Sequence, residues 1–260
     1  MGLEDLDTGT IRRRLSDRVV GSRVLYHRLL DSTMDEARRL ADDGSQEGTL
    51  VIAEEQTAGR GRFDRPWISS PGQNLSFSIV LRPDAGQLHY LNMAATLAVS
   101  GAIAELTGLA SATKWPNDVT INGRKVSGIL VETAVEEGEP RHAVVGIGLN
   151  VNLDTSKIPE IASAATSLYR ETGKHLDRTR LMLSLLERLD GLYGAVRRGR
   201  SLTEQWTAQL DTLGRSIQVR WRDKLLEGKA SGVNEQGNLL LAQADGSVVT
   251  VVAGEVTLQV

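Results

Sequence analysis

The sequence contains no cysteine, and this absence removes several kinds of chemistry at once. A chain without thiols cannot form disulfides, use a thiol nucleophile or hold a metal through thiolates. Its four histidines (His27, His89, His142 and His175) are widely spaced and lack the H-x-H or H-E-x-x-H patterns of metal sites. The sequence therefore predicts no protein metal site.

Long apolar segments are also missing. The longest apolar helical pattern, Leu91 to Leu106, is too short for a membrane span and contains Asn92 and Glu105. Residues 1–18 are polar and do not read as a secretory signal. The net charge of −3 is too small to indicate a general polyanion binder. We expect a cytoplasmic protein without a membrane partner.

The most informative stretch that is present spans residues 56–67, Q-T-A-G-R-G-R-F-D-R-P-W, between apolar runs at 50–53 and 75–81 that read as strands. Two glycines allow a close backbone approach to a ligand, and three arginines stand against one aspartate. The guanidinium fork matches carboxylate and phosphate oxygens two at a time, and Trp67 adds a flat face for a base. These features favour a loop over a phosphorylated, nucleotide-bearing species. Two other interpretations of this loop remain open, a solvated surface turn and a basic patch that contacts nucleic acid.

A strand-to-helix junction precedes this loop. Residues 23–30 alternate apolar and polar side chains and predict the first strand, and 31–36 (D-S-T-M-D-E) lead into a helix. Thr33 with Glu36 three residues later has the pattern of a capping box, which predicts Thr33 as the N-cap. The alternative is functional, with the Ser32 and Thr33 hydroxyls at a pocket mouth beside helix-terminal N–H groups.

A second site signal lies at residues 112–132. Asn122-Gly123 predicts a hairpin between strands at 119–121 and 125–135, with Lys125 at its return. Gly128 interrupts the second strand, which marks a bulge or a backbone approached by a ligand. A single lysine in a strand is usually solvated, but Lys114 and Lys125 flank a Pro-Asn-Asp corner, which favours a site.

The remaining segments outline the architecture. Helical patterns occupy 87–106, 178–197 and 201–213, and 153–175 reads as irregular connection. The glycines of the strand at 141–151 are explained by a closely packed helix. From residue 214 short strands and turns predict a small SH3-like barrel. We therefore expect two domains, 1–212 and 213–260.

Six motifs stand in order along the chain: D-S-T (31–33), G-R-G-R (59–62), R-P-W (65–67), K-W-P-N-D (114–118), G-R-K-x-x-G-I-L-V-E (123–132) and G-I-G-L-N-V-N (146–152). In these motifs the sequence resembles the biotin protein ligases, the group that includes the bacterial biotin repressor. The resemblance implies an α+β fold, with a mixed, largely antiparallel sheet backed by helices as in class II synthetases, and a C-terminal SH3-like barrel. It is closest to the monofunctional type, without the N-terminal DNA-binding domain.

The resemblance also implies an activity. Such enzymes convert biotin and ATP, with Mg²⁺, to biotinyl-5′-AMP and pyrophosphate, and then transfer biotin to the acceptor lysine of a biotin carboxyl carrier domain of acyl-CoA carboxylases. Carboxylate and α-phosphate repel each other until cations neutralise them, so the chemistry needs lysine and arginine. The resemblance places Asp118 as a helper in deprotonating the acceptor lysine.

The implied site residues fall into three groups. Biotin binding is assigned to Ser32, Thr33, Gln56, Gly59, Arg60, Gly61, Arg62, Lys125 and Gly128. ATP or adenylate binding is assigned to Arg62, Arg65, Trp67, Asn117 and Asn150. The catalytic cations are Lys125, Arg60, Arg62 and Lys114.

Two alternative functions were weighed. A lipoate ligase would share the fold and the reaction type. A nucleic-acid-binding regulator could use Arg12–Arg14, but the residues before Arg23 are too few for a winged helix, so we expect no sequence-specific DNA partner. For the assembly we expect a monomer or a weak homodimer.

Overall fold

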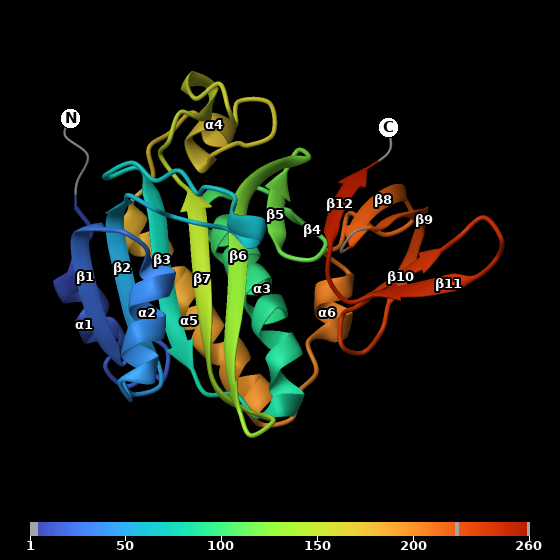
Figure 1. Cartoon of the computed structure of the whole chain (residues 1–260). Helices are drawn as coiled ribbons and strands as arrows, with labels where there is room; N and C mark the ends of the chain where they lie inside the picture. Colours follow the sequence, from blue (N-terminus) through green and yellow to red (C-terminus); the bar gives the residue numbers. More distant parts are fainter. Residues whose placement is uncertain (1–4, 222–223, 259–260) are drawn as a thin grey trace.

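The computed structural model describes residues 5–221 and 224–258, and seven of its strands form one mixed sheet. The strand order is β1-β2-β3-β7-β6-β5-β4, in which β1 and β2 are parallel and every other neighbouring pair is antiparallel (Figure 1). This confirms the expected α+β class with a largely antiparallel sheet. The strands are β1 (Arg23–Leu30), β2 (Thr49–Gln56), β3 (Asn74–Leu81), β4 (Ala112–Lys114), β5 (Asp118–Ile121), β6 (Arg124–Glu136) and β7 (Glu139–Asn150).

Helices cover the two faces of this sheet unequally. The long helices α3 and α5 pack on one face, whereas α2 lies alone on part of the other face, in front of the sheet in Figure 1. Helix α1 packs against β1 and α5. The helices are α1 (Thr8–Leu15), α2 (Thr33–Asp42), α3 (Leu88–Thr107), α4 (Leu168–Thr172), α5 (Arg178–Arg197) and α6 (Thr203–Thr207), with 3-10 turns η1 (Arg62–Asp64), η2 (Ala85–Gln87) and η3 (Thr155–Lys157).

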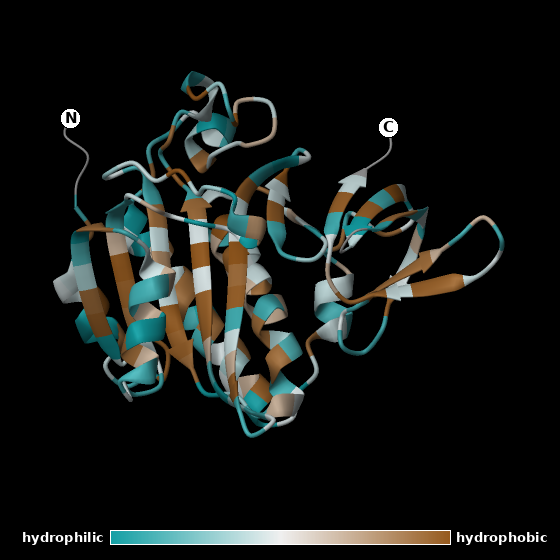
Figure 2. Cartoon of the chain, viewed as in Figure 1, coloured by the Kyte–Doolittle hydropathy of each residue, from teal (hydrophilic) through white to brown (hydrophobic). Residues whose placement is uncertain are grey.

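Alternation along the central strands explains this arrangement. On β3, Phe77 and Ile79 join the main core under α3 and α5, whereas Ser76 and Ser78 point to the face of α2. Strand β7 repeats the pattern, with Ile147 in the same core. The central strands are accordingly brown over much of their length in Figure 2. One sheet thus has a bulky face and a face of small side chains.

The start of α2 corrects one prediction. Ser32, in an extended conformation, caps the helix by accepting from the Asp35 N–H at 3.3 Å, so the prediction of Thr33 as the N-cap is wrong. Thr33 is the first helical residue, and its N–H donates to Gln56 Oε1 at 2.8 Å. Gln56 is the last residue of β2, so this hydrogen bond links the N-terminus of α2 to the sheet.

The last predicted helix is also shorter than expected. The pattern at 201–213 yields only α6, because the next residues run beside the edge of the sheet instead. The Thr113 N–H donates to the Gln209 carbonyl at 2.7 Å, and the Asp211 N–H donates to the Thr113 carbonyl at 3.1 Å. Tertiary pairing at this edge therefore ends the helix early. The predicted helices at 87–106 and 178–197 are confirmed.

The C-terminal region forms a separate five-stranded antiparallel sheet in the order β11-β10-β9-β8-β12, as expected of an SH3-like unit (Figure 1). It meets the first sheet at the segment after β4, where Trp115 Nε1 donates to the Gly237 carbonyl at 2.9 Å. The Trp115 side chain is buried at this junction, so an enclosed indole and its hydrogen bond join the two sheets. The strands are β8 (Ser216–Trp221), β9 (Lys224–Val233), β10 (Leu239–Ala242), β11 (Val248–Val251) and β12 (Glu255–Leu258).

Candidate functional site

A row of small residues across four strands forms the floor of a cavity of about 170 Å³. Ser76 on β3 is paired with Gly148 on β7, Gly148 with Gly128 on β6, and Gly128 with Asp118 on β5. Paired residues point to the same face of a sheet, so all four open toward the side of α2. Met34 of α2 packs against Gly146, one row further along. The result is a trough that runs across the strands beyond the N-terminus of α2.

The end of the trough near β2 carries neutral hydrogen-bonding groups. Thr33 and Gln56 line it, and the Ser78 hydroxyl donates to Thr33 Oγ1 at 2.8 Å. The first N–H groups of α2 lie at the same place, but the Thr33 N–H donates to Gln56 and the Asp35 and Glu36 N–H groups donate to Ser32. The polar character of this end therefore comes from the side chains of Thr33 and Gln56. This end suits a polar, uncharged group with both donors and acceptors.

The opposite end of the trough is cationic. Lys125 Nζ lies 2.7 Å from the Asp118 carboxylate, and Lys114 also lines the cavity. The register between β5 and β6 shifts beside Lys125, and a shift of this kind re-aims a side chain. The lysine folds back over Gly128, where an added Cβ would stand 2.8 Å from Lys125 Nζ. A register shift is therefore present close to Gly128, between Lys125 and Ser127, and the group that approaches the Gly128 backbone is the Lys125 side chain. The approach of a ligand stays a prediction.

The arginine-rich segment, residues 57–67, crosses in front of β7 and β6 and closes the trough from above (Figure 1). We call it the arginine loop. Its ends are joined by backbone bonds, from the Trp67 N–H to the Gly59 carbonyl and from the Gly61 N–H to the Arg65 carbonyl, each 2.8 Å. The tip turns through Phe63, whose φ of 57° lies in the left-handed region. The loop is a small hairpin with a tight tip.

Each arginine of the loop has a different partner. Arg62 Nη1 donates to Asn117 Oδ1 at 3.1 Å, and burial lowers the pKa of Arg62 even though Asp118 and Glu255 act in the opposite direction. Arg65 forms an ion pair of 2.5 Å with Glu255 of β12. Arg62 is thus a half-buried cation bonded to a neutral amide, and an added anion can form charge-assisted bonds with it.

Trp67 lies on the floor of the trough. A Cβ built on Gly148 would overlap the indole, so only glycine permits this contact. Lys125 Nζ stands 5.9 Å from the centre of the ring, within cation–π range. Trp67 Nε1 and Ser76 Oγ are both buried without a hydrogen-bond partner among the described residues. Buried polar atoms of this kind favour a ligand group or water that can pair with them.

Most of the predicted site residues meet at this cavity. Three do not line it: Ser32 is the N-cap of α2, Gly59 lies beneath the Trp67 carbonyl, and Asn150 bonds to Asn74 and to the Thr166 carbonyl. Those that line it are Thr33, Gln56, Arg60, Gly61, Arg62, Arg65, Trp67, Lys114, Asn117, Lys125 and Gly128. Their individual roles stay predictions.

Other lining residues were not assigned from the sequence. Ser76 and Gly148 lie on strands whose patterns were explained by packing alone. The alternation of serine with Phe77 and Ile79 on one strand was the signal that could have located Ser76. Glu255 comes from the second sheet, and no pattern in the sequence links it to the arginine loop.

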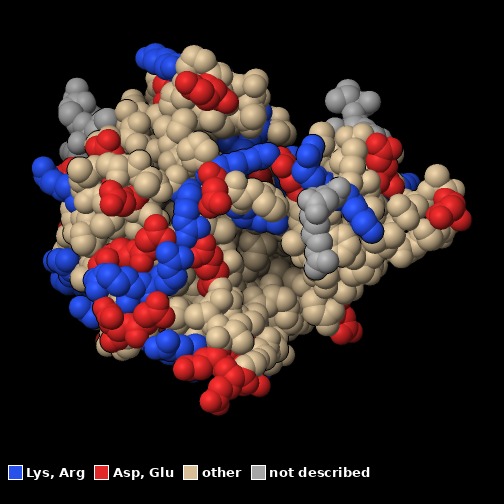
Figure 3. Space-filling model, in the orientation of Figure 1, with Lys and Arg blue, Asp and Glu red and all other residues tan. Residues whose placement is uncertain are grey.

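Cations dominate the rim of the cavity. Arg62, Arg65, Lys114 and Lys125 stand against the carboxylates of Asp118 and Glu255. Figure 3 shows this face hollowed between the two sheets, with Lys and Arg side chains along the upper edge of the hollow. Such a site can hold an anion and stabilise charge that develops on phosphate or carboxylate oxygens.

Residues 5–221 and 224–258 lack the features of two other classes of site. Within these ranges no three His, Asp or Glu side chains gather in a way that could hold a metal ion. Nor do these ranges contain a helix whose apolar stretch would reach across a bilayer.

Comparison with known proteins gives two family matches. Residues 26–150 match the biotin/lipoate A/B protein ligase family, and residues 212–258 match the biotin protein ligase C-terminal domain. The bifunctional ligase/repressor BirA of Bacillus subtilis is 36% identical over 93% of this chain and 76% of its own. The biotin–[acetyl-CoA-carboxylase] ligase of Mycobacterium tuberculosis is 32% identical over 94% of each chain.

A solved structure gives the same result. The biotin protein ligase of Aquifex aeolicus, in complex with biotin and ATP, superposes with a TM-score of 0.76 at 31% identity, over 91% of this chain and 98% of that one.

Proposed function

The chain belongs to the biotin protein ligase family, and we propose that it activates biotin with ATP to biotinyl-5′-AMP and transfers the biotinyl group to the acceptor lysine of a biotin carboxyl carrier domain. It is thus an ATP-dependent, AMP-forming ligase. Two relatives, from Paracoccus denitrificans and Mycobacterium tuberculosis, are named as ligases of acetyl-CoA carboxylase, which supports a carboxylase carrier as the protein substrate.

The polarity of the trough is the observation that carries this proposal. Thr33 and Gln56 supply neutral hydrogen-bonding groups at one end, and Lys125 supplies positive charge at the other. Biotin has a neutral ureido ring joined by an apolar chain to a carboxylate, and the glycine floor between the two ends suits that chain. The ring would lie near α2, and the carboxylate would lie at Lys125.

In the first step a carboxylate oxygen of biotin attacks the α-phosphorus of ATP, and the bond to pyrophosphate breaks. Lys125 and Arg62 would neutralise the two anions and stabilise the charge that grows on the phosphoryl oxygens. Lys114 would add charge at the same end. Asp118 and Glu255 bring carboxylates to the cavity, which fits Mg²⁺ that arrives on the phosphates of ATP and takes few protein ligands.

In the second step the amine of the carrier lysine attacks the acyl carbon, the amide bond forms, and AMP leaves. The amine must lose a proton, and Asp118, which lines the cavity beside Lys125, would help to receive it. Trp67 would hold the adenylate with Asn117 until the carrier docks. The predicted division into domains 1–212 and 213–260 belongs to this proposal, with Glu255 as the contribution of the second domain.

The competing ligand is lipoate, and a melting experiment separates the two. With biotin plus ATP, a tightly held adenylate at about 1,000 times its dissociation constant adds roughly 4 kcal/mol to stability. Lipoate plus ATP should add far less. A larger shift with lipoate, or no shift with biotin, would overturn the proposal.

Two expectations need their own tests. A mobility shift on duplex DNA, repeated over a range of salt, tests the expectation of no sequence-specific DNA partner. Labelling of a purified carrier domain, with its acceptor lysine replaced as the control, tests the protein substrate. The cytoplasmic location and the monomer or weak homodimer remain predictions.

A further inference from the structure

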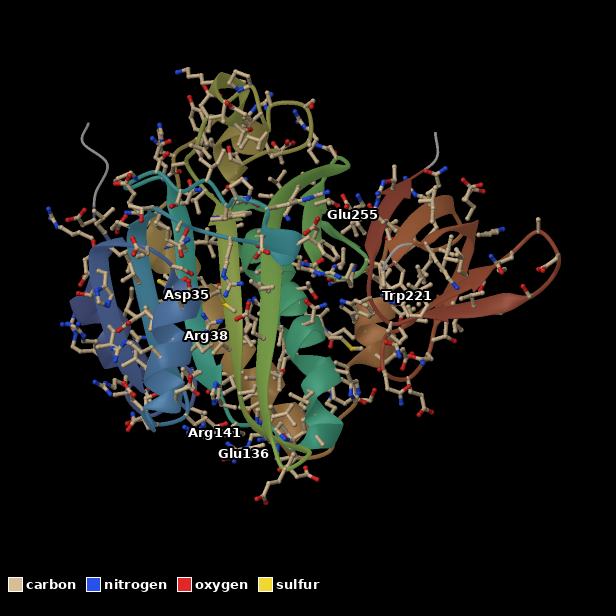
Figure 4. All side chains as sticks on the ribbon, viewed as in Figure 1. Asp35, Arg38, Glu136, Arg141, Trp221 and Glu255 are labelled. Carbon is tan, nitrogen blue, oxygen red and sulfur yellow. The ribbon has the colours of Figure 1, made fainter. Side chains whose placement is uncertain are left out.

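Arg60, the first arginine of the arginine loop, is enclosed by carboxylates. Its Nη1 lies 2.5 Å from Glu132 Oε1, and its Nη2 lies 3.1 Å from Glu132 Oε2 and 3.0 Å from Asp35 Oδ1. Arg38 binds the same two acids, at 3.2 Å to Glu132 and 2.6 Å to Asp35. Asp35 and Arg38 are labelled on α2 in Figure 4. We call Arg60, Glu132, Asp35 and Arg38 the anchor cluster.

The anchor cluster is electrically balanced, with two cations and two anions. The hydrogen bond from Arg60 to Glu132 raises the pKa of the guanidinium above its ordinary value, and Asp35 adds to the rise against the effect of burial. Arg62 differs on both counts, since its pKa is lowered by burial and it donates to the neutral amide of Asn117. Asp118 and Glu255 act on Arg62 without an ion-pair contact among the described residues, whereas Arg60 is in direct contact with two carboxylates. Arg62 can therefore offer more of its charge to a ligand than Arg60 can.

The cluster also joins three elements around the cavity. Asp35 lies in the first turn of α2, two residues after Thr33, and Glu132 lies on β6, four residues after Gly128. Arg60 comes from the start of the loop that covers the trough. The Arg60 guanidinium thus links the arginine loop to α2 at the neutral end of the trough and to β6 in its floor.

We propose that Arg60 is a positioning residue, and that Glu132 and Asp35 act with it to hold the arginine loop closed over the trough. Its planar fork donates to Glu132 through two nitrogens while one of them also reaches Asp35, a fixed geometry that the single ammonium nitrogen of lysine does not reproduce. By fixing the loop at its base, the cluster sets where Arg62 and Trp67 stand. This proposal rests on the proposed function only for its effect on ligands.

A small effect on global stability is part of the proposal. The side chains of Arg60 and Glu132 are 23% and 29% exposed, and partly exposed ion pairs contribute little to folding. Loss of the cluster should instead open a local segment, since loops lie at the low end of local stability. A local readout is therefore the sharpest one.

The first test is Glu132→Gln, with Glu36→Gln as its matched control. Glu36 lies on the same helix as Asp35 and pairs with Arg39 at 2.7 Å, within α2. In ligand-free protein, Glu132→Gln should speed hydrogen exchange at the Gly61 and Trp67 amides about tenfold, with an unchanged melting temperature. Glu36→Gln should leave both amides unchanged. Equal exchange in the two variants would overturn the anchor.

The second readout concerns the ligand. Glu132→Gln should release biotinyl-5′-AMP about tenfold faster, while the rate constant of pyrophosphate formation stays within about threefold, because a loose cover acts on dissociation. Arg60→Lys, which keeps the charge but not the fork, should also release biotinyl-5′-AMP faster than the wild type. An unchanged release rate, or a loss of pyrophosphate formation in Glu132→Gln, would contradict a positioning role.

A double-mutant cycle separates positioning from direct contact. If Arg60 acts through the carboxylates, Arg60→Ala, Glu132→Gln and their combination should give the same release rate, because each removes one shared interaction. If Arg60 touches the substrate, Arg60→Ala should slow pyrophosphate formation well beyond Glu132→Gln, and the proposal fails. Absence of biotin-dependent pyrophosphate in the wild type would refute the proposed function, yet the exchange experiment would still decide the anchor.

Discussion

The two faces of the seven-stranded sheet are built from the same strands and do different work. Toward α3 and α5 the strands carry large apolar side chains such as Phe77 and Ile147, and the face is sealed. Toward α2 they carry Ser76, Gly146 and Gly148, and part of the face is left for a cavity. Alternation at a period of two thus encodes a core and a site in one stretch of chain. Stability and chemistry should therefore respond to different mutations.

Charge follows the same division. On the sealed face Glu54 accepts from Arg178, Tyr26 and the N–H groups of Leu6 and Gly72. The Glu54 and Arg178 side chains are only 3% and 4% exposed. On the open face the cations stay partly accessible and line the trough. The buried pair of Glu54 and Arg178 links segments of the chain, whereas the cations that line the trough are accessible to a ligand.

The largest effect is expected on the sealed face. Arg178→Ala leaves the Glu54 carboxylate buried without its ion partner, and breaking a buried pair costs about 3–5 kcal/mol of unfolding free energy. Pyrophosphate formation per folded molecule should stay near that of the wild type. Urea unfolding and an activity assay below the transition check both halves, and a loss of less than about 1 kcal/mol would contradict the prediction.

On the open face, Lys125→Ala should have the opposite effect, a loss of activity with little change in stability. Removing this cation from the carboxylate and α-phosphate should cost on the order of 3 kcal/mol in the chemical step, about a hundredfold in rate. The urea midpoint should barely move, since Lys125 is partly exposed. Pyrophosphate release within about threefold of wild type, in a folded variant, would sink the assignment.

Arg62→Gly should show a smaller effect on a different step. A charge-assisted bond contributes roughly 1.5–3 kcal/mol, so losing one should raise the off-rate of the adenylate about ten- to hundredfold. The released mixed anhydride would then label lysines of a bystander such as albumin. The check is a blot with biotin and ATP; ATP consumption without extra bystander labelling would show that Arg62 does not retain the intermediate.

The mildest prediction concerns pH. Burial raises the pKa of Glu54, but the hydrogen bonds and charge of Arg178 outweigh it and hold the pKa below its ordinary value. A carboxyl with a lowered folded pKa contributes stability above its unfolded pKa and loses it as pH falls through the folded pKa. Each unit of lowering is worth about 1.4 kcal/mol.

The measurement is urea unfolding between about pH 7 and pH 3, compared with Glu54→Gln. Glu54→Gln should show a shallower loss of stability on acidification. Parallel curves for the two proteins would mean that Glu54 is not linked to acid unfolding.

Much of this arrangement is readable from local sequence. Alternation gave the strand at residues 23–30 with its observed bounds, the Asn122-Gly123 turn gave its hairpin, and apolar periodicity gave the helix at 178–197. These features depend on neighbours along the chain. The cap at Ser32 is local as well, since Ser32 accepts from Asp35 three residues later, and the pattern misplaced it by one residue. The early end of α6 depends on Thr113, which is distant in sequence.

The site divides in the same way. Lys125, Arg62 and Trp67 stand in motifs and were assigned directly. No local pattern marks Glu255, whose partner Arg65 is distant in sequence. Glu132 ends the motif at 123–132, but nothing near it in the sequence shows that it pairs with Arg60. Ion pairs between residues that are distant in sequence cannot be predicted from local sequence patterns.

The indole that rests on Gly148 has a consequence for affinity. Trp67 would hold an adenylate through the face of the indole that is turned away from Gly148. A ligand that lay directly on Gly148 would instead have to displace the indole, which would then act as an intramolecular competitor. If the indole holds this position in about nine molecules of ten, the apparent dissociation constant is about tenfold weaker than the intrinsic one. A short or weakly binding acid bears that whole penalty, whereas a ligand that spans the trough regains it through contacts at both ends. The resting protein thereby discriminates by ligand length before any bond is made or broken.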